Sequence, residues 1–150
     1  MKTSKSAQSS SKPEVIKVPR PMPRPNVYMN TSPFWEGCQE KKLLIQQCPK
    51  TGKYQFFPRP VSLFTGKRDT IWKEVSGNGV IYSWTNTFSA WPGHEERLPY
   101  ICAYVELSEG VRILCNIFNC SSADMHIGMP VKVYWETLEN NTLYPAFQPA

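Results

Sequence analysis

The sequence predicts a mainly β protein, in which an N-terminal helix and a degenerate rubredoxin-like ribbon precede a five-stranded OB-fold barrel. Three observations support this fold class. Two knuckle-like turns follow one another between residues 48 and 66. Beyond residue 70 the chain consists of runs rich in β-branched and aromatic residues, separated by glycine-containing turns. A short glycine-bearing loop joins two of these runs, as expected for a β-hairpin within a small closed barrel.

The 150 residues suffice for one domain with a hydrophobic core and a small appendage. We expect a disordered, basic and proline-rich tail at 1–30, the helix and ribbon at 31–72, and the barrel at 73–150. Residues 1–26 contain six basic residues and one acidic residue, whereas the remaining chain contains 11 of each and is neutral. The alternating prolines from Val18 to Pro25 favour polyproline-II geometry, so the tail could be a spacer or an arm along a partner.

Because the net positive charge lies in residues 1–26, any electrostatic attraction of nucleic acid depends on the tail.

A helix is expected to begin where Asn30-Thr31-Ser32-Pro33 precedes Phe34-Trp35-Glu36. A Thr or Ser residue can act as the N-cap, and the proline fits the first helical turn. Strand-like runs follow at residues 43–48 and 54–57, on either side of a tight turn that contains Gly52. These two runs are predicted to form the first half of the ribbon.

The two knuckles have the spacing of Cys-x-x-Cys-Gly motifs, but most of their metal ligands are replaced. The four ligand positions are Cys48, Thr51, Ser62 and Thr65. A structural zinc ion needs four Cys or His donors in a closed tetrahedron, and hydroxyl groups are poor substitutes for thiolates. We therefore expect the outline of a ribbon without zinc and without another cofactor. Packing of apolar and aromatic side chains would then hold the ribbon together.

The barrel is predicted from a series of β-rich runs. One of them, residues 100–107, alternates apolar and polar positions, which is typical of a half-buried strand. The loop Ser108-Glu109-Gly110 joins it to the next run as a hairpin. Five strands with a central hairpin and one longer connection suit an OB-type barrel. The β-rich runs from residue 70 onward, counted from the end of the ribbon, are 71–75, 79–88, 100–107, 111–118, 131–136 and 142–147.

Several functional classes find little support in the sequence. No run is long and apolar enough for a membrane span, and the N-terminus lacks the apolar region of a secretory signal. Five cysteines without a disulfide-like pattern indicate a reducing, cytoplasmic environment. His94 could serve as a base beside Glu95 or Glu96, but no nucleophile or orienting partner is evident. His126 is expected to make a local hydrogen bond in a turn. We therefore expect no catalytic residues.

Binding is the more promising class. The aromatic residues of the barrel could stack on single-stranded nucleic acid, but a neutral barrel lacks the basic track that such grooves need, and alternating strand aromatics usually belong to a core. Aromatic residues and arginine are typical anchors of protein interfaces. Arg59 is the preferred candidate for a CoA phosphate or a partner carboxylate, with a structural salt bridge as the alternative. The candidate partner- or CoA-binding residues are Arg59, Phe34, Trp35, Trp84, Trp91 and Arg97.

In order and spacing, several stretches resemble the DUF35 family. They include Phe34-Trp35-Glu36-Gly37, Phe57-Pro58-Arg59-Pro60, residues 77–85, residues 103–107 with Glu109-Gly110, residues 127–131 and residues 145–149. The resemblance extends from about residue 33 to the C-terminus. It implies a zinc ribbon before an OB-fold, although three of the four ligand positions here depart from that pattern.

The resemblance also implies a function. Family members are similar in being small, non-catalytic partners of thiolase-superfamily acyl-CoA enzymes, such as thiolases, retro-aldolases and acyltransferases, and the ribbon or barrel helps to frame the CoA path. We therefore expect an accessory subunit that docks onto such an enzyme in a hetero-oligomer. The alternatives are a subunit of a MaoC-like enoyl-CoA hydratase, a stand-alone OB-fold module that binds acyl-CoA or single-stranded nucleic acid, and a free-standing hydrolase or transferase.

Overall fold

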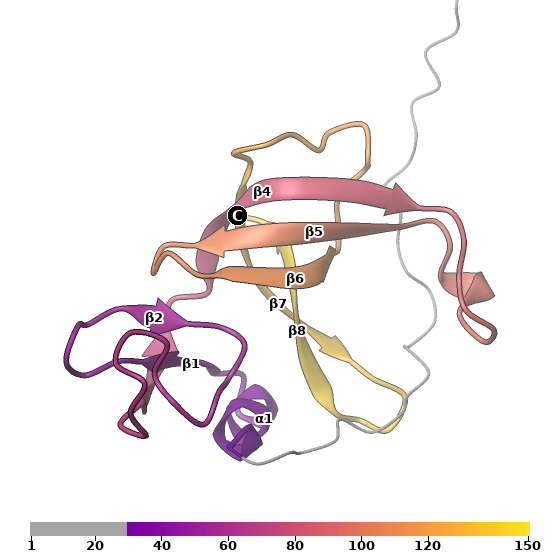
Figure 1. Cartoon of the computed structure of the whole chain (residues 1–150). Helices are drawn as coiled ribbons and strands as arrows, with labels where there is room; N and C mark the ends of the chain where they lie inside the picture. The colour runs from indigo at the N-terminus through magenta and orange to yellow at the C-terminus, as the bar shows by residue number, and fades with distance from the viewer. Residues whose placement is uncertain (1–29) are drawn as a thin grey trace, which may run out of the picture.

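The computed structural model describes residues 30–150, in which a short helix and a small sheet lie beside a closed β-barrel (Figure 1). The predicted tail lies outside the described residues, apart from Asn30. Helix α1 (Ser32–Gln39) begins at the expected place and has Pro33 in its first turn. It buries Phe34 and Cys38 against the sheet that follows. Within residues 30–150, no helix has the length and apolar character needed to cross a membrane.

The small sheet contains β1 (Leu43–Gln47), β2 (Tyr54–Gln55) and β3 (Ile71–Val75) in the order β2-β1-β3. Both pairings are antiparallel. The turn between β1 and β2 is the first knuckle, and the second knuckle lies in the long connection from β2 to β3. Strand β3 spans the boundary expected at residue 72 and completes the ribbon sheet by pairing with β1 along five positions.

The barrel has the five strands that an OB-fold requires, in the order β4-β5-β6-β8-β7. A pairing of β7 with the start of β4 closes it, and β6 runs parallel to β8. The predicted hairpin joins β5 to β6, and a 3-10 turn η1 (Glu95–Arg97) lies in the connection from β4 to β5. The predicted five-stranded barrel is therefore confirmed. Its strands are β4 (Asn78–Thr87), β5 (Tyr100–Leu107), β6 (Arg112–Ile117), β7 (Pro130–Thr137) and β8 (Leu143–Pro149).

One hydrophobic core runs through the ribbon and the barrel. The alternation in β5 buries every second side chain, from Ile101 to Leu107, as predicted. These residues belong to the same cluster as Phe34 of α1 and Ile45 of β1. Because the two parts share apolar burial, the ribbon is positioned as a fixed extension of the barrel.

Two glycines allow the ribbon to join the barrel closely. Gly77, at φ +71°, follows β3, and a Cβ atom at this position would lie 2.6 Å from Cγ1 of Val133. A Cβ atom at Gly79 would lie 2.5 Å from the carbonyl oxygen of Glu106. Neither position has room for a side chain, so the motif Gly77-Asn78-Gly79 is a requirement of packing.

Candidate functional site

The two knuckles keep the backbone of a metal-binding ribbon. In the first, the N–H of Cys48 donates to the carbonyl of Lys53 at 2.9 Å, and the N–H of Gly52 donates to the carbonyl of Cys48 at 2.8 Å. In the second knuckle, the N–H of Ser62 donates to the carbonyl of Lys67 and the N–H of Gly66 donates to the carbonyl of Ser62, each at 2.8 Å. The glycine of each knuckle has a positive φ, which permits the tight turn. The knuckles predicted from spacing are therefore present as backbone structures.

Hydroxyl groups and one thiol connect the knuckles where metal ligands would stand. Cys48 and Ser62 are both 0% exposed. Hydrogen bonds from Ser62 and then Thr51 lower the pKa of the Cys48 thiol to about 7, because they stabilise its thiolate form. The hydroxyl of Thr65 instead lies 3.3 Å from a carboxylate oxygen of Asp69. The cause of the Cys48 pKa shift places Ser62 of the second knuckle and Thr51 of the first knuckle beside the Cys48 thiol.

These residues do not fit a zinc ion. Only one of the four positions supplies a thiol, and the other three supply neutral hydroxyls. In the part of the chain that the structure describes, no three His, Cys, Asp or Glu side chains gather in a group that could hold a metal. A closed tetrahedral site needs four soft or borderline donors, so the chemistry of this donor set differs from that of a zinc centre.

A pair of buried glutamines holds the connection between the knuckles. Gln46 and Gln55 are 1% and 2% exposed and lie opposite each other on β1 and β2. Oε1 of Gln46 accepts from the N–H of Arg59 at 2.8 Å, and its Nε2 donates to the carbonyl of Arg59 at 3.0 Å. Gln55 donates to Oε1 of Gln46 at 2.9 Å and to the carbonyl of Val61 at 3.1 Å. Its own Oε1 accepts from the N–H of Leu63 at 2.8 Å.

This glutamine pair, which we call the Gln46–Gln55 clamp, satisfies backbone groups of residues 59–63 in the way a strand would. Sequence reasoning missed it. The available signal was a pair of amide side chains flanking the first knuckle, at strand positions where the neighbouring pattern is apolar. The clamp fixes the start of the second knuckle on the sheet.

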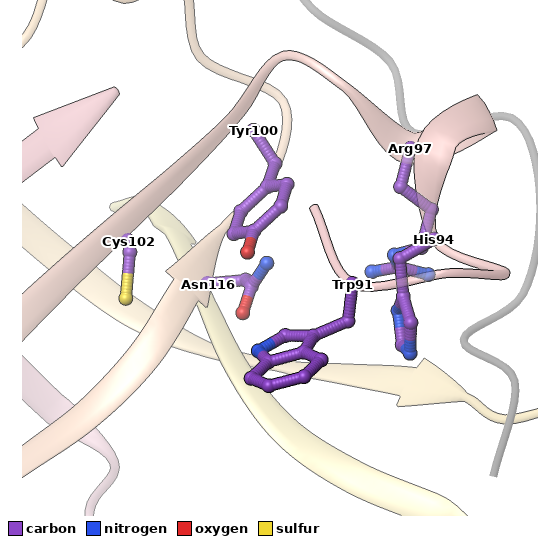
Figure 2. A pocket seen from close by; sticks show the side chains of 6 residues that line it. All are labelled: Trp91, His94, Arg97, Tyr100, Cys102 and Asn116. Carbon is purple, nitrogen blue, oxygen red and sulfur yellow. The ribbon is translucent and has the colours of Figure 1, made fainter. Parts of the chain in front are cut away.

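A second candidate site lies on the barrel, between the β4–β5 connection and the outer face of β5 and β6. It is an open cavity of about 230 Å³ lined by Trp91, His94, Arg97, Tyr100, Cys102 and Asn116. Figure 2 shows the side chains of Trp91, Tyr100 and Asn116 directed toward a common space, with Cys102 and His94 at opposite ends of the group. The cavity offers aromatic surface and an amide, which suits binding. The separation of the thiol from the imidazole gives no nucleophile–base pair.

Arg97 fixes the β4–β5 connection to strand β7 by a buried ion pair. Its Nη2 donates to Oε1 of Glu136 on β7 at 2.7 Å, and the two side chains are only 3% and 5% exposed. Trp91 of the same connection is 84% exposed. A buried charge-assisted bond therefore fixes a connection that presents a large aromatic ring to solvent.

The other predicted interface residues occupy different environments. Phe34 is buried, with ring centroids 5.0 Å from Trp35 and 5.8 Å from Phe56. Trp35 is half-buried and packs on Tyr144 of β8 at 5.9 Å. Trp84 of β4 is half-buried against the core. These three rings join the helix, ribbon and barrel.

Arg59 and the histidines face solvent to different degrees. The side chain of Arg59 is exposed, and the ion pairs found among residues 30–150 do not include it. The predicted alternative, a structural salt bridge of Arg59, is therefore absent from the described part. Nδ1 of His126 lies 3.1 Å from the carbonyl of Asp124, which is the local hydrogen bond expected for it. His94 is half-exposed in the barrel connection.

Two family models match the chain, one in the helix and ribbon and one from β3 to β7. Residues 35–61 match the family model described as the rubredoxin-like zinc ribbon domain of ChsH2. Residues 72–136 match the model described as the C-terminal OB-fold domain of ChsH2. The match to a zinc ribbon covers most of the helix and the first knuckle and ends before Ser62, so it includes only two of the four ligand positions, Cys48 and Thr51.

Similar proteins include both scaffolds and enzyme subunits. A DUF35 domain-containing scaffold protein of Methanocaldococcus jannaschii is 30% identical over 110 residues, which cover 71% of this chain and 77% of that protein. A probable enoyl-CoA hydratase alpha subunit of Thermomonospora curvata is 29% identical over 147 residues, 97% of this chain. This chain spans only 44% of the length of that hydratase subunit.

Among solved structures, the chain is similar to one from an Ltp2–ChsH2(DUF35) aldolase. The TM-score is 0.76 at 29% sequence identity, and the match covers 84% of this chain and 98% of the other. The likeness therefore includes both the ribbon and the barrel.

Proposed function

The chain belongs to the DUF35 family, and we propose that it is a non-catalytic accessory subunit that docks onto and completes a thiolase-superfamily acyl-CoA enzyme. The observation that carries this proposal is the structural match to the DUF35 chain of an aldolase over 98% of that chain's length. A match along the whole length of that chain supports a role in the same kind of assembly.

The geometry supports a binding role over a catalytic one. A catalytic centre needs a nucleophile or base held within hydrogen-bond reach of an orienting partner. Of the two histidines, His126 is committed to a turn carbonyl, and His94 lies at the far end of the barrel cavity from Cys102 (Figure 2). The described residues instead offer exposed aromatic and basic side chains on rigid elements.

Among the residues singled out from the sequence, we assign direct contact with the partner or with CoA to Arg59 and Trp91. Both are exposed, and each lies on a connection that buried hydrogen bonds hold in place. Phe34, Trp35 and Trp84 support these connections through the shared core, and Arg97 does so through its ion pair. Preorganised surfaces of this kind reduce the entropic cost of association.

We also assign this subunit a zinc-free ribbon and a reducing, cytoplasmic environment. The donor set at the knuckles supports the first assignment. The second is supported by five cysteines, all within residues 30–150, that form no disulfide. Elemental analysis of the purified full-length chain tests the metal assignment, and one zinc per chain would contradict it.

A second candidate function is an accessory subunit of a MaoC-like enoyl-CoA hydratase. The similarity to a probable enoyl-CoA hydratase alpha subunit over 97% of this chain favours it. That relative is more than twice as long as the matched region, so this chain would correspond to one part of it.

Co-expression separates the two functions. The full-length chain is produced with the thiolase-superfamily protein or with the MaoC-like protein encoded beside it, and complexes are measured by size-exclusion chromatography with light scattering. The proposal expects a stable hetero-oligomer with the thiolase-superfamily protein and acyl-CoA turnover that requires both chains. Co-elution with the hydratase alone favours the second candidate, and co-elution with neither contradicts both.

A further inference from the structure

The net charge of residues 30–150 is zero, but positive and negative side chains are concentrated in different parts of the fold. Residues 48–70, which contain both knuckles, have five basic residues and one acidic residue, a net charge of +4. The rest of residues 30–150 has six basic and ten acidic residues, a net charge of −4. The folded part is neutral as a whole, as expected from the sequence, but its basic residues are concentrated in this segment. The basic side chains of the segment are Lys50, Lys53, Arg59, Lys67 and Arg68, all exposed.

The changed ligand positions contribute to this charge. A zinc ion bound by four thiolates forms a centre with net negative charge, which offsets nearby lysines. Here three of the four positions are neutral hydroxyls. None of the ion pairs within the described residues includes a basic side chain of the 48–70 segment. Within the described residues, these basic side chains are therefore exposed and outside any ion pair.

An apolar centre accompanies the charge. Leu63 and Phe64, at the tip of the second knuckle, are 56% and 40% exposed. Nζ of Lys53, from the first knuckle, lies 5.7 Å from the centroid of the Phe64 ring, so the two tips share one surface. The N–H of Leu63 is bonded to Gln55 of the clamp, which holds this centre in a fixed position. We call Leu63, Phe64, Lys50, Lys53 and Lys67 the knuckle surface.

We propose that the knuckle surface docks onto an apolar patch with an acidic rim on the partner enzyme subunit. This inference rests on the proposed accessory function and adds to it the face that binds and the chemistry that is bound. An apolar centre within a charged rim is the anatomy of a protein interface. Charge complementarity at the rim speeds association and selects the partner.

The alternative occupants fit the charge pattern less well. A single-stranded nucleic acid would extend from the ribbon over a barrel that, with α1 and β1, carries net −4, and that surface would repel its phosphates. A second copy of this chain could place its acidic barrel on the knuckle surface. Such head-to-tail contacts are not closed by two-fold symmetry, so they would produce rings or filaments.

The test measures association of full-length variants with the partner subunit that co-purifies with the wild type, by surface plasmon resonance at several salt concentrations. We expect Lys53→Glu/Lys67→Glu to slow association about tenfold or more at low salt and to weaken its salt dependence. We expect Leu63→Ser/Phe64→Ser to speed dissociation about tenfold, because apolar contact governs the lifetime of the complex.

Matched controls lie outside the knuckle surface. Lys41→Glu/Lys132→Glu makes the same change in net charge at two other exposed lysines. Ile127→Ser removes a side chain that is 73% exposed in the turn before β7. Both controls are expected to keep association and dissociation rates within about twofold of the wild type. Circular dichroism confirms that each variant is folded.

Each other outcome overturns the inference. If the knuckle variants behave as their controls do while the wild-type complex forms, the accessory function stands and the docking face is wrong. If they lose binding to a labelled single-stranded oligonucleotide, or lose self-association, while partner binding is kept, the occupant is wrong. If the wild type binds no partner subunit, the proposed function fails and the inference fails with it.

Discussion

Replacement of Gln46 by leucine tests whether the Gln46–Gln55 clamp holds the ribbon in place of a metal. The two side chains have similar volume, so the change removes hydrogen bonds without opening a cavity. Gln46 accepts from the N–H of Arg59 and from Nε2 of Gln55, and it donates to the carbonyl of Arg59. In Gln46→Leu these three groups lose a partner at a position that is 1% exposed.

The expected loss of unfolding free energy follows from the buried groups that no longer have Gln46 as a hydrogen-bond partner. A buried donor or acceptor without a partner costs about 1–3 kcal/mol. The Arg59 carbonyl keeps a second bond, from Nδ2 of Asn30 at 2.9 Å, so its loss is small. The Arg59 N–H and one N–H of Gln55 carry most of the cost, and burial of leucine returns about 1 kcal/mol. We expect the free energy of unfolding to fall by about 2–4 kcal/mol.

Urea denaturation followed by circular dichroism measures this loss, and hydrogen exchange locates it at the amides of Arg59 and Leu63. Gln47→Leu is the matched control on the same strand, because Gln47 makes one exposed bond, to the carbonyl of Gly52. That variant should lose under about 1 kcal/mol. Equal stability of the two variants, or unchanged protection of the Arg59 amide in Gln46→Leu, would refute the role assigned to the clamp.

Three further predictions concern the barrel and the knuckle thiol. Arg97→Ala should lower the free energy of unfolding by about 3–5 kcal/mol in denaturant titrations, because it removes one partner of a buried ion pair with Glu136. Gly79→Ala should cost about 1–3 kcal/mol in the same assay, since its Cβ would lie 2.5 Å from the carbonyl of Glu106. Cys48 has a pKa of about 7 in the folded protein and an ordinary pKa of 9.0 when unfolded. Between these two pH values the folded chain has lost a proton that the unfolded chain still holds, so the free energy of unfolding should rise with pH. This contribution is absent below pH 7, and Cys48→Ser should abolish the slope.

Much of the fold was predictable because its signals are local. Pro33 after a Thr-Ser pair marks the helix start, and the knuckles follow from the spacing of Cys48 and Ser62 with their glycines. The alternation from Ile101 to Leu107 predicts a half-buried strand because side chains alternate across a sheet. Each of these patterns needs only neighbouring residues to be read.

The rest depends on partners that are distant in sequence. Arg97 was expected at an interface, yet it pairs with Glu136, 39 positions away. The run at residues 71–75 has the composition of any β-strand, and only its pairing with β1 assigns it to the ribbon. The role of Gln46 depends on the backbone of Arg59 returning to it, 13 positions later. Residue type limits such pairings but does not specify them.

The clamp and the charge separation together explain how a ribbon can persist after its ligands change. A zinc centre would supply stability, rigidity and local negative charge at once. In this chain, the hydrogen bonds of Gln46 and Gln55 hold the connection between the knuckles on the sheet. The hydroxyl groups at the ligand positions do not supply the negative charge of a zinc–thiolate centre, and the knuckle surface is therefore positive. Loss of the ligands at Thr51, Ser62 and Thr65 thus changes what the ribbon can bind while its backbone stays the same, and a partner selected for this subunit should carry the complementary acidic rim.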